Sequence, residues 1–85
     1  MINIKNIVDS AIEANIHAYK ETHKTYRMYR KVWKTAKTRK DINDFRDLSY
    51  RYLSEFNAIE DTLARIFPDH EDYIKEKLTN AIWWE

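Results

Sequence analysis

Basic side chains recur at helical spacing through the segment YKETHKTYRMYRKVWKTAKTRK, residues 19–40. This segment holds nine of the chain's 15 basic residues and a single acidic one. Steps of three and four residues place side chains on one face of a helix. Ammonium and guanidinium groups aligned in this way bind successive phosphates and release counterions, so the segment predicts a polyanion-binding surface. The predicted contacts to phosphate are Lys20, Lys24, Arg27, Arg30, Lys31, Lys34, Lys37, Arg39 and Lys40.

Three aromatic residues, Tyr26, Tyr29 and Trp33, are interleaved with these cations. Aromatic rings beside a basic surface stack unpaired bases, which is a common mode of binding single-stranded RNA. Two alternatives stay open. The tyrosines can instead pack against a second helix, and the acidic second part of the chain can cover the cations. Residues 20–40 have a net charge of +8 and residues 41–85 one of −6, whereas an ordinary solvated face mixes the two signs.

A second set of polar residues, Glu13, His17 and Glu21, follows a four-residue spacing on the same predicted helix. Carboxylate and imidazole groups bind metals, but a tight site recruits three or four ligands with further support around them. We expect surface pairs here and neither a metal nor a cofactor. The chain has no Cys and no Gly, hence no thiolate nucleophile and no glycine-rich phosphate loop, so we expect no enzyme activity.

The elements that position these residues are predicted to be helices. The chain contains no glycine and one proline, Pro68, which favours long helices joined by few turns. We expect an all-α fold forming one domain over residues 1–85: a long antiparallel helical hairpin plus a short C-terminal third helix. Hydrophobic periodicity places the helices at about 3–40, 42–67 and 69–83. Asp41 or Asn43 is expected to cap the second helix, and Asp69 the third.

Apolar residues also predict how the helices pack. The second helix has an apolar row from Ile42 to Ile66, and the third has Tyr73, Ile74 and Leu78 on one face. The apolar residues near the N-terminus can receive either the third helix or a second copy of the protein; these are Ile2, Ile4, Ile7, Val8 and Ile12. A small core is marginal alone, so we expect a homodimer. Neighbouring helical residues point about 100° apart, so one of Trp83 and Trp84 is expected at an interface.

The location of the protein is predicted from what the sequence lacks. No run of about 18 apolar residues is present, and MINIKNIVDS does not have the pattern of a signal peptide. The absence of Cys suits a reducing compartment. A basic amphipathic helix can lie on an anionic membrane, but here its apolar side is rich in Ala, Thr and Tyr and would insert poorly. We therefore expect a cytoplasmic protein with no membrane partner.

The short length, the abundance of Lys, Asn, Ile and Tyr, and the basic-aromatic segment 19–40 resemble the small accessory proteins of large tailed phages. Within that group the chain is similar to the toxin–antitoxin inhibitory factors of T4-like phages. The resemblance implies RNA binding, an RNA-bridged or direct contact with a toxin nuclease, and action in the host cytoplasm. It extends loosely over the whole chain and includes no motif that matches residue by residue, so it assigns no site residue.

Three functional hypotheses follow. The leading one is a small basic-helix RNA-binding protein that inhibits a host defence nuclease or toxin. The second is a protein-only inhibitor that docks the basic helix, or the Trp83-Trp84 end, on an acidic partner. The third is an oligomeric sponge for cyclic nucleotides, a behaviour known among small helical phage proteins, with its sites between subunits.

Overall fold

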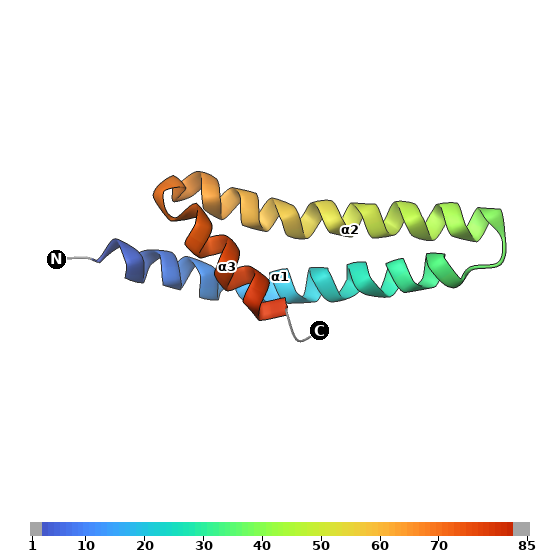
Figure 1. Ribbon diagram of the computed structural model, residues 1–85, viewed down its shortest axis with the longest axis horizontal. Coiled ribbons are helices and arrows are strands. Elements are labelled where there is room, and N and C mark those ends of the chain that lie inside the picture. Colours follow the sequence, from blue (N-terminus) through green and yellow to red (C-terminus); the bar gives the residue numbers. More distant parts are fainter. Residues whose placement is uncertain (1–2, 83–85) are drawn as a thin grey trace.

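The computed structural model describes residues 3–82, which form two long antiparallel helices and a short third helix (Figure 1). Helix α1 spans Ile4–Thr35, α2 spans Arg39–Ile66 and α3 spans Glu71–Ile82, with a 3₁₀ turn, η1, at Pro68–His70. The protein is a rod of 59 × 23 × 17 Å. These elements confirm the all-α hairpin with a short C-terminal helix. No helix in the described part of the chain is long and apolar enough to cross a membrane.

The connection between α1 and α2 differs from the sequence prediction. Helix α1 ends at Thr35, five residues before the predicted end at Lys40, and Ala36 is extended. Thr38 caps α2, because its hydroxyl accepts a hydrogen bond of 3.1 Å from the backbone N–H of Asp41. Neither Asp41 nor Asn43 is the cap. Without a glycine or proline at this corner, the periodicity alone could not show where one helix ended and the next began.

The second corner follows the sequence prediction more closely. The backbone N–H of Phe67 donates to the carbonyl of Leu63 at 2.9 Å, which closes the last turn of α2. Pro68 then begins the 3₁₀ turn, so the predicted stop at this residue is confirmed. Helix α3 begins at Glu71, two residues later than predicted. No described residue has a positive φ angle, so a chain without glycine makes both turns without strain.

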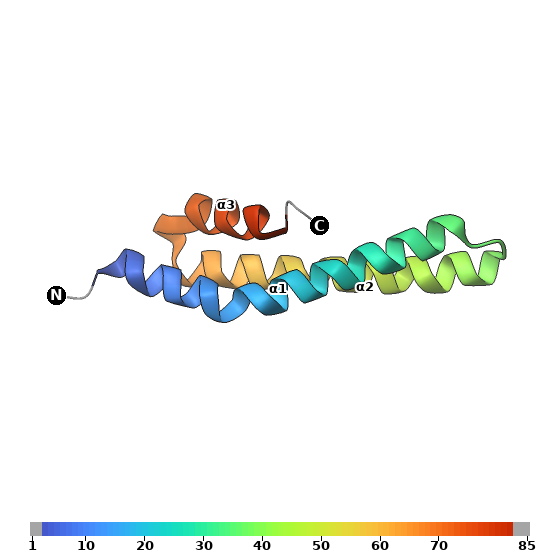
Figure 2. The ribbon, with the colours of Figure 1, turned by 90° about the horizontal axis from the view of Figure 1, so that it is seen from below.

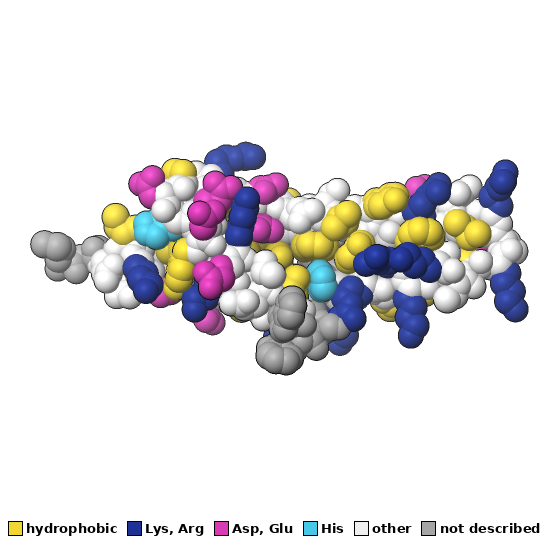
Figure 3. All heavy atoms as spheres, in the orientation of Figure 1, with side chains coloured by type: hydrophobic (Ala, Val, Ile, Leu, Met, Phe, Trp, Pro, Cys, Tyr) yellow, Lys and Arg dark blue, Asp and Glu magenta, His cyan; other side chains and the backbone are white. Residues whose placement is uncertain are grey.

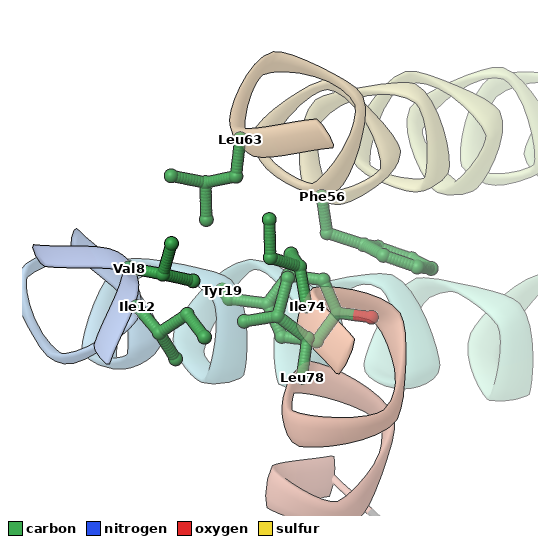
Figure 4. Packing of buried hydrophobic residues seen from close by; sticks show 7 residues of the cluster. All are labelled: Val8, Ile12, Tyr19, Phe56, Leu63, Ile74 and Leu78. Atoms are coloured by element: carbon green, nitrogen blue, oxygen red, sulfur yellow. The ribbon is translucent and has the colours of Figure 1, made fainter. Parts of the chain in front are cut away.

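The hydrophobic core lies where all three helices meet (Figure 4). The side chains of Val8, Ile74 and Leu78 are completely buried, and the ring of Tyr19 meets that of Phe56 edge to face at 5.7 Å. The Tyr73 hydroxyl donates a hydrogen bond to the Asp9 carboxylate and so ties α3 to α1. Helix α3 therefore packs against the N-terminal part of α1. This is one of the two partners that the sequence predicted for the apolar residues there, the other being a second copy of the protein. The core residues are Val8, Ile12, Tyr19, Phe56, Leu63, Ile74 and Leu78.

Helix α3 covers only part of the hairpin, and it lies on one side of it (Figure 2). We call residues 4–22 and 53–82 the three-helix half, and residues 23–52 the turn half. All seven core residues belong to the three-helix half. In the turn half two helices pack without a third, and Ser49 is the one buried residue there. The predicted interface residues Trp83 and Trp84, and also Ile2, lie outside the described residues.

Candidate nucleic-acid interface

The nine basic residues predicted from the sequence are all exposed. Six of them lie on α1, and we call these the cationic row: Lys20, Lys24, Arg27, Arg30, Lys31 and Lys34. Lys37 lies in the connection between the helices. Arg39 and Lys40 lie in the first turn of α2, where the helix dipole disfavours cations. The predicted first helix over residues 3–40 would have placed them at its C-terminal end, so that placement is wrong.

Charge is divided along the length of the molecule. On the face shown in Figure 3, acidic side chains gather around α3 and the adjacent end of the hairpin, whereas basic side chains dominate toward the turn. The division follows the sequence, because residues 41–85 contain 11 of the 14 acidic residues and residues 20–40 contain nine of the 15 basic ones. The small net charge of the whole chain thus conceals a strongly positive end.

The acidic residues of α2 do not neutralise the cationic row. In the described part of the chain, ion pairs link Arg51 with Glu55 at 3.5 Å and Lys75 with Glu71 at 2.8 Å, each within a single helix. None of the nine predicted basic residues pairs with a described acid. This geometry answers the question left open by the sequence, since α2 packs beside the row without covering it.

Four cations of the row surround one open pocket. Arg27, Arg30, Lys31 and Lys34, together with Thr35, line a hollow of about 380 Å³ on the surface of α1. Their spacing of three, one and three residues brings all four side chains to one side of the helix. The Thr35 hydroxyl donates to the carbonyls of Lys31 and Val32. The positive charge of the pocket comes from the four basic side chains. Such a pocket suits phosphate groups, for which arginine also provides paired donors.

The aromatic residues predicted to stack bases are part of the packing between α1 and α2. Tyr29 lies nearly parallel to Phe45 and Tyr52, with ring centroids 6.1 and 5.6 Å away. Tyr26 lies 5.5 Å from the ring of Phe56. Both tyrosines are half-buried. Their packing against the second helix is the alternative that the sequence left open.

Trp33 is also half-buried, but its environment differs. Its indole Nε1 is buried and has no hydrogen-bond partner among the described residues. The ammonium group of Lys34 lies 6.0 Å from the centre of its ring, a distance at which the cation and the ring attract each other weakly. Trp33 thus lies beside Lys34 of the cationic row, with its indole nitrogen turned away from solvent.

Two residues of α2 that the sequence did not indicate, Arg46 and Tyr50, lie on the other helix of the hairpin from the cationic row. Tyr50 is 55% exposed, and the guanidinium of Arg46 donates to the side-chain oxygen of Asn43 at 3.1 Å. Tyr50 lies two residues from Tyr52, which belongs to the apolar row. The sequence could have indicated Tyr50, because its position does not follow the helical spacing of the apolar row, and a helix directs such a side chain away from its packed face.

The residues of the second candidate cluster, Glu13, His17 and Glu21, are all exposed on α1. Within residues 3–82 there is no group of three or more His, Cys, Asp or Glu residues arranged to hold a metal ion. His23, one turn farther along α1, is half-buried and lies edge-on to Phe56 at 5.1 Å. These side chains therefore do not converge on a reactive centre.

The resolved pKa shifts belong to the three-helix half. Burial, together with the smaller effect of the nearby Glu60 carboxylate, raises the pKa of Tyr19 to about 12. Burial also raises the pKa of Glu60, an effect that Lys75 opposes.

Searches of protein-family models, curated proteins and solved structures found no match to this chain. The class defined by the fold and the surface is an all-α helical hairpin with an exposed cationic row.

Proposed function

We propose that the protein binds RNA through its phosphate backbone, using the cationic row of α1. The observation that carries this proposal is that six exposed cations lie along one helix without an ion pair to any described acid. Like charges held close together raise the local positive potential. A polyanion relieves this repulsion, and the counterions that it releases favour binding. Lys37, Arg39 and Lys40 extend the surface around the turn.

The biological role that we propose is inhibition of a host defence nuclease or toxin, in a complex that contains RNA. Its support is the resemblance of the length, composition and basic-aromatic segment to small phage inhibitors. An RNA held on α1 can bridge to a nuclease because the nuclease itself binds RNA. The long exposed surface of a 59 Å rod leaves room for both partners.

The RNA-binding proposal is tested by reversing charge in the pocket. The triple variant Arg27→Glu, Lys31→Glu, Lys34→Glu is compared with Arg51→Glu, Arg65→Glu, Lys77→Glu, which changes the net charge equally on α2 and α3. All six residues are exposed. Fluorescence anisotropy with labelled RNA measures affinity between ~50 and ~200 mM salt, and about six phosphate contacts predict a loss of roughly 10³-fold over that range. The row variant should lose binding and the control should retain most of it. Equal affinity of the two variants would contradict the proposal.

The proposed role is tested by inhibition of an RNA-cleaving toxin. The wild-type protein should slow cleavage, and the row variant should not. Removal of co-purifying RNA by nuclease and a high-salt wash should also weaken the inhibition. If inhibition survives both changes, the protein acts instead by direct docking on its partner.

A homodimer forms part of this proposal. Its support is the group of exposed isoleucines at the end of the hairpin opposite the turn, where Ile4 and Ile66 are 59% and 61% exposed and Ile7 is also exposed. Exposed large aliphatic side chains that gather on one part of a surface are typical of an interface. Light scattering after gel filtration measures the mass, and Ile66→Glu should shift a dimer to the monomer. A monomeric wild-type protein at high concentration would contradict the dimer.

A further inference from the structure

We infer that the RNA bound by the cationic row is double-helical and is contacted along its backbone. This inference rests on the proposed function and specifies its ligand. It departs from the single-stranded mode that the sequence predicted, in which tyrosines and a tryptophan beside the cations stacked unpaired bases.

The ring of Tyr29 is already stacked within the protein. Phe45 and Tyr52 lie at 21° and 16° to its plane. These two residues are seven positions apart on α2, which corresponds to roughly 10 Å along a helix. Tyr29 thus belongs to an aromatic layer between α1 and α2, where its ring is half-buried and is already stacked on protein rings.

The other two predicted rings are engaged as well. Tyr26 is tilted against Phe56 and lies 6.0 Å from the ring of His23. Trp33 has a buried Nε1, and its ring has the Lys34 ammonium as a neighbour. Among the described Phe, Tyr and Trp residues, Tyr50 alone is exposed, and it lies on α2. Proteins that bind single strands stack successive bases on several rings, so this surface offers too few free rings for that mode.

The shape of the surface suits a double helix. From Lys20 to Lys34 the cationic row extends roughly 21 Å at about 1.5 Å per residue. The rod is 17 Å across at its narrowest, which is too thick for the deep, narrow major groove of A-form RNA. Double-stranded RNA is instead recognised from outside, by its shape and its phosphates. The phosphates of a duplex are also already ordered, so binding avoids the entropy loss of fixing a flexible strand.

The test uses the full-length protein and two probes at the same salt concentration. One is an adenine–uracil RNA duplex of about 20 base pairs, and the other is the uridine strand alone, which has no stable internal pairing. We expect the duplex to bind about tenfold more tightly, because it presents the phosphates of two strands to the same row. A preference below about threefold, or tighter binding of the single strand, overturns the inference.

The variant Tyr50→Ala provides an independent arm, since removing an exposed side chain should leave the hairpin folded. Duplex affinity should change by less than about twofold, whereas loss of a base-stacking ring costs roughly tenfold or more. A tenfold loss would overturn the inference and identify Tyr50 as a stacking residue. If neither probe binds, the proposed function itself fails, and this outcome differs from a preference for the single strand.

Discussion

The two halves of the rod are built from different side chains. The three-helix half contains all seven core residues, five of which are aliphatic. The turn half contains a parallel aromatic layer, in which Tyr29 stacks with Phe45 and Tyr52. It also carries most of the cationic row. One half therefore concentrates the buried apolar contacts, and the other concentrates the exposed charge.

The difference follows from the position of α3. Where a third helix is present, aliphatic side chains such as Ile74 and Leu78 reach complete burial. Where it is absent, two helices alone cannot enclose a core, and large rings provide the contact area between them. The outer side of α1 then remains open to solvent and can hold charge. This arrangement predicts that stability and RNA binding depend on different residues.

The largest effect is expected for Leu78→Ala, which creates a cavity at a fully buried position of α3. Such substitutions reduce the free energy of unfolding by about 2–5 kcal/mol. Chemical denaturation followed by circular dichroism measures the loss. The matched control is Met28→Ala, because Met28 is a large apolar residue of the turn half that is 51% exposed. Its cost should stay below about 1 kcal/mol. Similar losses for the two variants would contradict the division between the halves.

Alkaline pH should weaken the three-helix half through Tyr19. Its pKa is raised to about 12, chiefly by burial, so the folded state favours the neutral phenol. The resulting stability is fully present below the unfolded pKa of about 10 and is lost as the pH rises toward 12. A shift of this size corresponds to roughly 2–3 kcal/mol.

The control for this effect is Tyr19→Phe, which keeps the ring but cannot ionise. The free energy of unfolding of both proteins is measured from pH 9 to 12 at one temperature. All other titrating groups are shared, so the difference between the two curves isolates Tyr19. The wild-type curve should fall more steeply above pH 10. Parallel curves would show that the folded protein does not hold Tyr19 in its neutral form.

A smaller effect is expected for Tyr29→Ala in the turn half. Loss of a half-buried ring from an aromatic layer should cost about 1–3 kcal/mol. Hydrogen exchange should accelerate mainly at residues 23–52 and much less around α3. Tyr29→Phe keeps both stacked contacts and should be close to neutral. Uniform acceleration over both halves would show that the rod unfolds as one unit and that the two regions are not energetically distinct.

Much of the fold could be predicted because it depends on periodicity. The apolar row of the second helix and the face with Ile74 and Leu78 lie at regular helical spacing. Phe56 and Leu63 of that row and both residues of α3 are buried as expected, whereas Ile66, the last residue of the row, is exposed. The boundary at Thr35 could not be predicted in the same way. Ala36, Lys37, Arg39 and Lys40 are good helix formers, and the start of α2 is marked by a cap at Thr38, whose hydroxyl accepts from the backbone N–H of Asp41.

For the candidate site, the sequence predicted which residues carry charge but not which rings remain free. The spacing of Lys24, Arg27 and Lys31 is a local property of one helix, so their common exposed face could be predicted. Whether Tyr29 stacks a base or another ring depends on what α2 places opposite it. That contact joins residues distant in sequence, and single-sequence periodicity contains no information about their register.

The smallest effect concerns the cost in stability of placing charge at the turn. Lys40 lies in the first turn of α2, beside Asp41. A cation there opposes the helix dipole, whereas an anion is favoured by about 0.3–1 kcal/mol. We therefore expect Lys40→Glu to raise the free energy of unfolding by a similar amount, with Lys40→Gln intermediate. The same substitution should weaken RNA binding and reduce its salt dependence by about one phosphate contact. A higher free energy of unfolding together with a lower RNA affinity would show that the turn half retains this cation for binding. A decrease in both would show that Lys40 supports the fold instead.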